Sequence, residues 1–223
     1  MPVWVRVLGE TGVYPVRRIF CVGRNYEAHA REMGVAVDRE APFYFTKPAS
    51  AIVPSGERVP YPPGTSNYHY EMELVVALGA PAFQISVDAV ERVVFGYAAG
   101  LDMTRRDLQL EARAKQRPWD LGKAFEQSAV IGPITKAAEY PPLGPQRIML
   151  KVGETIRQDA HLSDLIWSVP EIVSHLSRYY HLGPGDIIYT GTPEGVGPVS
   201  SGDEIVGSIE GLSPVRLSIG PSE

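Results

Sequence analysis

Hydrophobic residues along the chain recur mainly in short runs separated by turn-forming residues. Val3–Leu8 and Arg147–Val152 both combine β-branched and other apolar residues, a pattern typical of strands. Gly and Pro are numerous, at 22 and 20 residues, and are spread along the chain, which favours many strands joined by turns. The same pattern predicts further strands at Ile19–Val22, Phe43–Thr46, Glu71–Leu78, Val94–Leu101, Asp186–Thr190 and Val215–Ser218.

Two segments in the first half of the chain carry helix signals. Tyr26–Met33 is followed by Gly34, a residue suited to the left-handed position after a helix C-terminus. In Thr104–Gln116, Thr104 is the expected N-cap, and Asp107 would lie near the positive end of the helix dipole. Both segments are therefore predicted to be helices.

A third helix is predicted at Pro170–His181, where Ser168 and Glu171 form a capping-box pattern. Strands outnumber helices and do not alternate with them regularly. We therefore predict a β-rich α+β fold with a mostly antiparallel or mixed sheet. No repeat or change of composition divides the chain, so one domain is expected over residues 1–223, with residues 1–17 as a short N-terminal strand segment.

Composition excludes several classes of function. The net charge of −5 provides no basic surface for nucleic acid or for an anionic membrane. No run approaches the roughly 18 apolar residues of a membrane helix, and the N-terminus does not resemble a secretory signal. Cys21 is the only cysteine, so no intrachain disulfide can form, and it is expected to be inert core. These features predict a soluble, cytoplasmic protein.

Three acidic residues are the first candidates for chemistry. Glu71 and Glu73 are two apart in a predicted strand and therefore point to the same face. Asp102 follows another apolar run. Buried together, such carboxylates would repel, and a cation between them would remove the penalty. Three oxygen ligands favour Mg²⁺, Mn²⁺ or Ca²⁺ over zinc. The pattern Glu-x-Glu alone is equally typical of a solvent-facing edge strand.

A histidine and a glutamate form a second candidate. His29 and Glu32 are three apart and would share a helix face. A carboxylate beside an imidazole raises its pKa, fixes its tautomer and makes it a better base for water. The alternative is an exposed helix of mixed charge, which Glu27 and Arg31 would also suit.

Two lysines and one glycine-rich turn complete the candidates. Lys47 and Lys123 each lie beside hydrophobic residues, although such lysines usually extend to water. The turn Gly191–Gly197 can offer backbone N–H groups to a carboxylate. It lacks the Gly-Lys-Ser/Thr ending of a P-loop, and the motifs of serine hydrolases, dinucleotide-binding folds and zincins are absent from the sequence.

Taken together, these motifs resemble the fumarylacetoacetate hydrolase family. The resemblance extends from about residue 18 to the C-terminus, with the motifs in the family's order. It implies a strongly bent, mixed β-sheet roll with a few short helices, usually assembled as a homodimer. The matching segments are Cys21–Tyr26 leading to His29 and Glu32, Phe45–Pro48, Glu71–Leu74, Gly100–Asp107, Lys123–Phe125 and Thr190–Gly197.

The resemblance also assigns roles to residues. Glu71, Glu73 and Asp102 match the family's metal ligands, and the metal is typically Mg²⁺ or Mn²⁺, with Ca²⁺ in some members. His29 and Glu32 match the pair that activates water, and Lys123 matches the lysine near the metal. The positions that match substrate-contacting or pocket-lining residues of other members are Lys47, Arg106, Gln109 and Thr192.

Within the family, the short chain resembles the acylpyruvase and fumarylpyruvate hydrolase branch. This implies metal-dependent hydrolysis of a carbon–carbon bond in a 2,4-dioxo acid such as fumarylpyruvate or a related acylpyruvate. Alternatives on the same metal site are decarboxylation of oxaloacetate and isomerisation or hydration of a 2-oxo-enoic diacid. A non-catalytic protein that binds 2-oxo acids is a further alternative. The expected partner is a small 2-oxo acid, and neither nucleic acid nor a membrane is expected to bind.

Overall fold

The computed structural model of the chain describes residues 3–32 and 41–222. In this part of the chain, the largest sheet is mixed, because β3 pairs with β15 and β5 with β11 in parallel while its other pairs are antiparallel. Its strands follow the order β4 (Phe43–Lys47), β3 (Arg18–Gly23), β15 (Asp186–Tyr189), β8 (Met72–Leu78), β9 (Val94–Asp102), β11 (Ala129–Ile131) and β5 (Ile52–Pro54), with β12 (Thr135–Lys136) also on β9.

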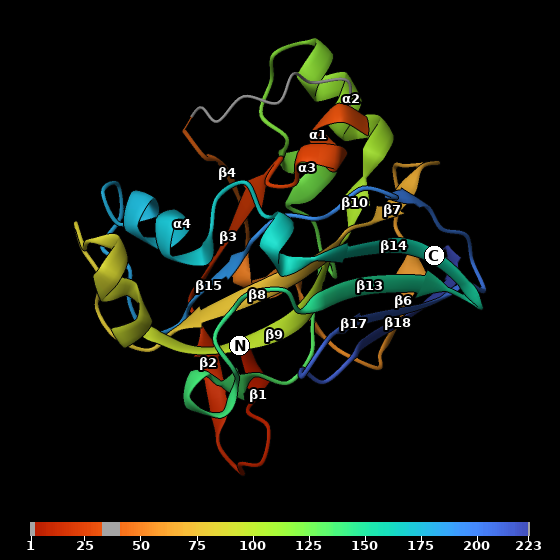
Figure 1. The fold of residues 1–223 in the computed structure, drawn as a ribbon. Helices are drawn as coiled ribbons and strands as arrows, with labels where there is room; N and C mark the ends of the chain where they lie inside the picture. Colours follow the sequence, from red (N-terminus) through yellow and green to blue (C-terminus); the bar gives the residue numbers. More distant parts are fainter. Residues whose placement is uncertain (1–2, 33–40, 223) are drawn as a thin grey trace.

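A second sheet curls against the first, and two small sheets flank them (Figure 1). The second sheet has the order β14 (Thr155–His161), β13 (Arg147–Val152), β17 (Glu204–Ile209), β18 (Val215–Ser222) and β6 (Arg58–Tyr61). The small sheets consist of β10 (Thr104–Arg105), β7 (Tyr68–Tyr70) and β16 (Gly197–Pro198), and of the hairpin β1 (Val3–Arg6) and β2 (Val13–Val16).

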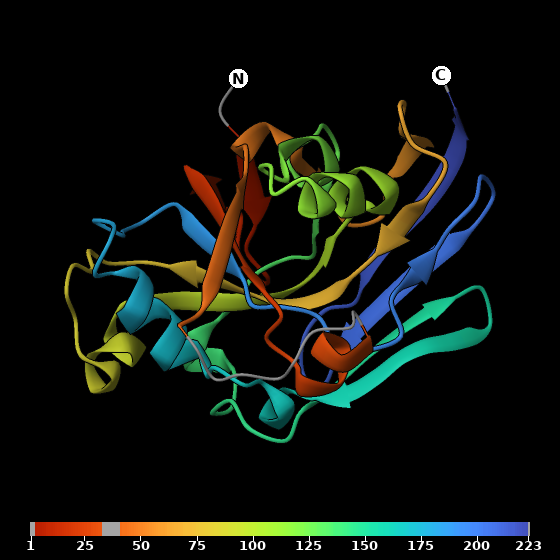
Figure 2. The same cartoon turned by 90° about the horizontal axis from the view of Figure 1, so that it is seen from above.

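Short helices cover selected edges of this strand-rich body. Three of them lie at the same end of the molecule in Figure 1, and Figure 2 shows α1 on one side of β8 and β9 and α2 with α3 on the other. None of the helices in the described residues is long and apolar enough to cross a membrane. The helices are α1 (Glu27–Glu32), α2 (Arg106–Ala114), α3 (Asp120–Lys123) and α4 (Val169–Leu176).

Strand β8 is the centre of the core, because every one of its residues is buried. Leu74 and Val76 pack in the cluster that includes residues of the second sheet. Val75 and Ala77 point to the opposite face and pack in the cluster that includes the β1–β2 hairpin. Burial on both faces explains why Leu74–Leu78 form a continuous apolar run in β8, with Glu73 as its one polar residue. Glu73 thus lies in a strand that is buried throughout, with Glu71 just before it and Asp102 at the end of the neighbouring β9.

The predicted β-rich α+β class is confirmed, and all eight predicted strands are present. Seven of them agree with the observed bounds to within two residues, whereas the last strand, predicted to end at Ser218, continues to Ser222. Cys21 is fully buried, and burial raises the pKa of its thiol, which fits inert core. The capping box of Ser168 and Glu171 is present at α4. Gly34 lies outside the described residues.

Two helix boundaries were predicted wrongly. Thr104 is not an N-cap, because it belongs to β10 and its hydroxyl donates to the carbonyl of Asp102, so α2 begins only at Arg106. The last helix ends at Leu176 instead of His181. Beyond it, backbone N–H groups bond three residues back, as that of Tyr179 does to Leu176, which tightens the chain into turns.

Candidate metal and catalytic site

The pairing of β8 with β9 brings the three acidic residues together. Glu73 is opposite Gly100 in the antiparallel register, and the backbone N–H of Asp102 donates to the carbonyl of Glu71 at 2.9 Å. Carboxylate oxygens of Glu71, Glu73 and Asp102 all lie within 4.8 Å of one another. The period-two spacing in one strand and the end of its neighbour therefore converge on one point, as the sequence predicts.

These carboxylates are almost inaccessible to water, with exposed fractions of 5% for Glu71, 2% for Glu73 and 0% for Asp102. Burial, followed by the charges of Asp102 and Glu71, raises the pKa of Glu73 well above its usual range. Burial opposes ionisation of Glu71 too, but Lys123 and Arg106 outweigh it and hold its pKa well below its usual range. The cluster therefore contains one carboxyl group whose negative charge is poorly compensated.

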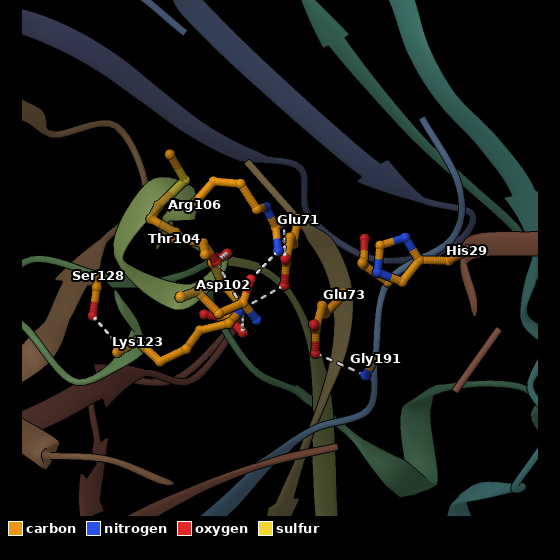
Figure 3. Close-up of polar contacts among 12 residues, drawn as sticks. His29, Glu71, Glu73, Asp102, Thr104, Arg106, Lys123, Ser128 and Gly191 are labelled. Atoms are coloured by element: carbon orange, nitrogen blue, oxygen red, sulfur yellow. Dashed lines mark hydrogen bonds and ion pairs between the residues drawn. The ribbon is translucent and has the colours of Figure 1, made fainter. Parts of the chain in front are cut away.

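Lys123 bridges two of the acids from the short helix α3. Its Nζ donates to Glu71 Oε2 at 2.7 Å, to Asp102 Oδ2 at 2.8 Å and to Thr104 Oγ1 at 2.7 Å. Burial opposes the charge of Lys123, but Asp102 and Glu71 raise its pKa, so it stays protonated. Figure 3 shows the carboxylates between Lys123 and Arg106 on one side and His29 on the other.

Lys47 supports the cluster from beneath. Its fully buried Nζ lies 2.8 Å from Asp102 Oδ1 and donates to Ser128 Oγ at 2.9 Å and to the carbonyl of Met103 at 3.1 Å. It also bonds the carbonyl of Lys123. These partners occupy the protons of Lys47, which does not line the cavity over the acids. Its contact with substrate stays a prediction.

Arg106 and Gln109 meet at the start of α2. The guanidinium of Arg106 pairs with Glu71 Oε1 and donates to Gln109 Oε1. Both side chains are buried and line the cavity over the carboxylates. Arg106 is thereby tied to a candidate metal ligand, and the contact of Arg106 and Gln109 with substrate stays a prediction.

The described residues fit a hard divalent cation. The donor set is entirely oxygen, it is buried, and the unfavourable charge of Glu73 is relieved by a cation close to it. No other group of three or more His, Cys, Asp or Glu side chains among the described residues has this ligand spacing. The ligands of the ion would be the carboxylates of Glu71, Glu73 and Asp102.

The predicted His–Glu pair forms on α1, and its histidine lines the same cavity. His29 Nδ1 lies 3.2 Å from Glu32 Oε2, and the backbone N–H of Gly195 donates to the same carboxylate at 3.2 Å. Because a carboxylate only accepts, Nδ1 carries the proton and Nε2 is left with its lone pair. Burial lowers the pKa of His29, although Glu71 and Glu32 oppose this shift. The imidazole is therefore neutral near pH 7.

The glycine-rich turn after β15 does offer N–H groups to carboxylates, but to the protein's own. Gly191, at φ 100°, donates to Glu73 Oε2 at 2.8 Å. Buried Gln158 on β14 holds the turn in place, because its Nε2 donates to Thr192 Oγ1 and to the carbonyl of Pro193, both at 2.8 Å. No motif in the sequence pointed to Gln158, since only the tertiary fold brings β14 to this turn.

A cavity of about 40 Å³ lies over this cluster. Among the residues predicted to form the site, those that line it are His29, Glu71, Glu73, Lys123, Arg106, Gln109 and Thr192. Sequence reasoning missed Arg24, Arg113 and Trp119, which also line it. Arg24 has a φ of 59°, unusual for a residue other than glycine and often found at functional sites. The left-handed conformation of Arg24 is seen only in the structure and has no signal in the sequence.

Comparison with known proteins agrees with this geometry. Residues 18–219 match the fumarylacetoacetate (FAA) hydrolase C-terminal family. The chain belongs to this family. It is therefore an enzyme of the fumarylacetoacetate hydrolase family, with the β-rich fold expected for it.

Individual relatives carry two different activities. The chain is 52% identical over 193 residues to a fumarylpyruvate hydrolase of Ralstonia sp., covering 86% of this chain and 100% of that protein. It is also 41% identical over 203 residues to the mitochondrial oxaloacetate tautomerase of Homo sapiens, covering 91% of each.

One solved structure is similar over nearly the whole length. It is the crystal structure of fumarylpyruvate hydrolase from Pseudomonas aeruginosa in complex with Mn²⁺ and pyruvate, with a TM-score of 0.96 and 48% identity. The match covers 99% of this chain and 97% of that one.

Proposed function

We propose that this protein is a metal-dependent hydrolase that cleaves a carbon–carbon bond of a 2,4-dioxo acid, with fumarylpyruvate or a related acylpyruvate as substrate. The observation that carries the proposal is the shared cavity, which is lined by Glu71 and Glu73 of the buried carboxylate cluster and by His29, the partner of Glu32. The relatives that are fumarylpyruvate hydrolases support the same reaction.

Glu71, Glu73 and Asp102 are the proposed ligands of Mn²⁺ or Mg²⁺, and their all-oxygen chemistry also accommodates Ca²⁺. Mn²⁺ is favoured by its presence in the similar Pseudomonas aeruginosa structure. When bound, the ion would act as a Lewis acid toward the carboxylate and 2-oxo oxygens of the substrate.

The charges around the cavity favour an anionic substrate. The three carboxylates are matched by the three cationic side chains of Lys47, Lys123 and Arg106. Addition of a divalent cation makes the buried cluster formally positive, and an anionic 2-oxo acid restores the balance. Neutral substrates would not gain this stabilisation.

His29 is the proposed general base. Its Nδ1–H is oriented by Glu32, so the lone pair on Nε2 is available to accept a proton from water. The resulting hydroxide oxygen attacks the C4 carbonyl of the substrate. Glu32 is itself held by the N–H of Gly195, which restricts the orientation of the imidazole.

Cleavage of the C3–C4 bond leaves the electron pair on the pyruvate fragment as its enolate. Lys123 is the proposed group that stabilises that negative charge. Its protons are bonded to Glu71, Asp102 and Thr104, so it would act through its positive charge at the cavity wall. The proton held on His29 then moves to C3 of the fragment. For fumarylpyruvate and water, the products are fumarate and pyruvate, and the new carboxylic acid group formed at C4 releases one proton.

Oxaloacetate tautomerisation is the second candidate, favoured by the 41% identical relative. It requires only proton transfer between carbon and oxygen of a chelating 2-oxo acid, so the cluster and His29 would suffice without attack by water. This reaction differs from the decarboxylation considered from the sequence, since no carbon–carbon bond breaks.

The decisive experiment is product analysis with fumarylpyruvate, acetylpyruvate and oxaloacetate, before and after chelation and with Mn²⁺ restored. We expect release of pyruvate from a dioxo acid that stops with chelator and returns with Mn²⁺. Accelerated enol-to-keto conversion of oxaloacetate, without pyruvate release from either dioxo acid, would favour the tautomerase instead. Calorimetric binding of these acids without turnover of any would indicate a non-catalytic binding protein.

A further inference from the structure

A second cleft continues outward from the cavity over the carboxylates. The two share the lining residues Arg24, Phe45, Arg113, Trp119 and Lys123. The outer cleft has a volume of about 690 Å³, which lies within the usual range of small-molecule sites. A substrate anchored at the carboxylate cluster can therefore extend past Lys123 into this cleft.

The walls of the outer cleft suit a flat carbon chain. The ring of Trp119 lies 5.0 Å from that of Phe43 and 6.0 Å from that of Phe45, measured between centroids. Phe45 also lies beneath Lys123, whose Nζ is 4.9 Å from the ring centroid. Aromatic faces of this kind pack against planar conjugated groups.

The electrostatics of the outer cleft favour a negative charge at a distance from the metal cluster. The described side chains that line it include the cations Arg24, Arg113, Arg117 and Lys123, against the single acid Asp120. Arg24 and Arg113 also line the inner cavity, so they lie where the two spaces meet.

Arg24 and Arg113 both lie where the two spaces meet, and the charge of Arg113 acts on Arg24. Burial, and then the charge of Arg113, lowers the pKa of Arg24, whose guanidinium lies 5.9 Å from the ring centroid of Phe43. Arg24 reaches this place from a left-handed backbone conformation, which costs free energy in a residue other than glycine. Guanidinium groups at this place can donate charge-assisted hydrogen bonds to a carboxylate in the outer cleft.

We propose that the outer cleft is a subsite for a second carboxylate, with Arg24 and Arg113 as the residues that contact it. This rests on the proposed function and narrows it, because it selects dicarboxylic 2,4-dioxo acids over acylpyruvates that end in an alkyl group. Arg117 lines only the outer cleft and adds to its positive potential.

The first test compares fumarylpyruvate with acetylpyruvate on the Mn²⁺-loaded protein and on Arg24→Gln and Arg113→Gln. The ratio of the two kcat/KM values should fall about 10- to 100-fold in each variant, the scale of a lost charge-assisted hydrogen bond. Because both substrates are assayed on one sample, partial misfolding cancels from the ratio. Lys115→Gln removes a positive charge just after α2, outside both spaces, and should leave the ratio unchanged.

An equal loss for both substrates in Arg24→Gln and Arg113→Gln would overturn the subsite, since it would mean that the arginines act only on the fold or on the shared core of the substrate. An unchanged ratio would overturn it as well. The same fall in Lys115→Gln would mean that the effect comes from the positive charge around α2 in general. Direct contact of the two arginines with the second carboxylate would then not be its cause.

A binding measurement separates this proposal from the reaction itself. Mn²⁺-loaded protein with pyruvate is titrated with fumarate and with crotonate, which has the same trans carbon chain but only one carboxylate. We expect fumarate to bind at least about tenfold more tightly, with the preference lost in the Arg24→Gln/Arg113→Gln double variant. The two proposals can fail separately. If the preference for fumarate is seen and is lost in the double variant, but no dioxo acid is hydrolysed, the subsite is supported and the hydrolase proposal is contradicted. A preference that survives in the double variant, or is absent from the wild type, contradicts the subsite.

Discussion

At the scale of single residues, Glu73 differs from its two acidic neighbours. Glu71 and Asp102 each pair with cationic side chains, whereas Glu73 accepts a hydrogen bond from the N–H of Gly191. A bound cation is thus the natural compensation for its charge. We expect Glu73→Gln to weaken Mn²⁺ binding at least about 100-fold, measured by titration with electron paramagnetic resonance detection of free Mn²⁺.

The glutamine retains the size of Glu73 and can still accept from Gly191, so the fold should be preserved. Glu111→Gln is the matched control, because its side chain lies on the exposed surface of α2 and pairs with Lys115. Full Mn²⁺ affinity in Glu73→Gln would remove this residue from the ligand set.

His29 allows a prediction about pH. A general base works in its neutral form, so kcat/KM should be constant around pH 7 and fall as the pH drops through the pKa of His29. Burial displaces that pKa below 6.5, so the fall should be centred below 6.5. His29→Ala should reduce the rate about 10²- to 10⁴-fold at pH 7 while Mn²⁺ stays bound.

The pH profile separates a base from a structural histidine. In His29→Ala the acidic limb of the profile should disappear along with the rate, whereas the exposed His161→Ala should retain both. A near-normal rate, or an acidic limb that persists unchanged in His29→Ala, would exclude His29 from the role of base.

At the scale of elements, Gln158 joins three pieces of the fold. From β14 it accepts from the N–H of Met72 on β8 and donates to Thr192 and Pro193 in the glycine-rich turn. Truncation leaves these buried groups without partners. Gln158→Ala should therefore lower the free energy of unfolding by about 2–3 kcal/mol, measured by urea denaturation.

The neighbouring exposed residue Arg157 provides the comparison on the same strand. Arg157→Ala should change the free energy of unfolding by less than about 0.5 kcal/mol. Equal values for the two variants would show that the bonds of Gln158 contribute little to stability.

Elements with a strong local signal were predictable from the sequence. β8 and β9 each contain a long apolar run, Leu74–Leu78 and Val94–Leu101, and the capping box of Ser168 and Glu171 is a pattern of residues only three apart. The strands β7, β10 and β16 span only two or three residues and exist because the fold brings them into register. The local sequence gives no signal for such pairings. For this reason Thr104 was predicted to be a helix cap instead of a strand residue.

The candidate site also has a part that could be predicted from the sequence and a part that could not. The convergence of Glu71, Glu73 and Asp102 follows from strand periodicity and from acids at strand ends, so the sequence could predict it. The supporting role of Lys47 and the bonds of Gln158 depend on contacts between residues far apart in the chain. Such contacts become visible only when the sheets are assembled.

At the scale of the whole molecule, some expectations remain predictions. The homodimer, the single domain and the cytoplasmic location derive from the sequence and from family resemblance. The charges of the carboxylate cluster, in contrast, lead to a prediction about the stability of the whole molecule.

Without a metal, the folded protein holds a proton that the unfolded chain releases. The pKa of Glu73 is raised well above 4.5 in the fold, so between 4.5 and that higher pKa the folded state binds more protons than the unfolded state. The contribution of Glu73 to the stability of the folded state is therefore fully present below pH 4.5. It is lost as the pH rises through the raised pKa of Glu73. Glu71, whose pKa is lowered, titrates below 4.5 and does not act in this window.

Mn²⁺ and the proton compete for the same carboxylate, so the stabilisation by Mn²⁺ should grow with pH. At a concentration of 100 times its Kd, a ligand adds about 2.7 kcal/mol to the folded state, which corresponds to roughly 5–10 °C in Tm for a chain of this size. Scanning calorimetry between pH 5.5 and 8 should give a larger increase in Tm at the upper end. In Glu73→Gln, which cannot ionise at this position, the increase should be small at every pH. Equal increases across this range in the wild-type protein would mean that the cluster is already ionised before the metal binds.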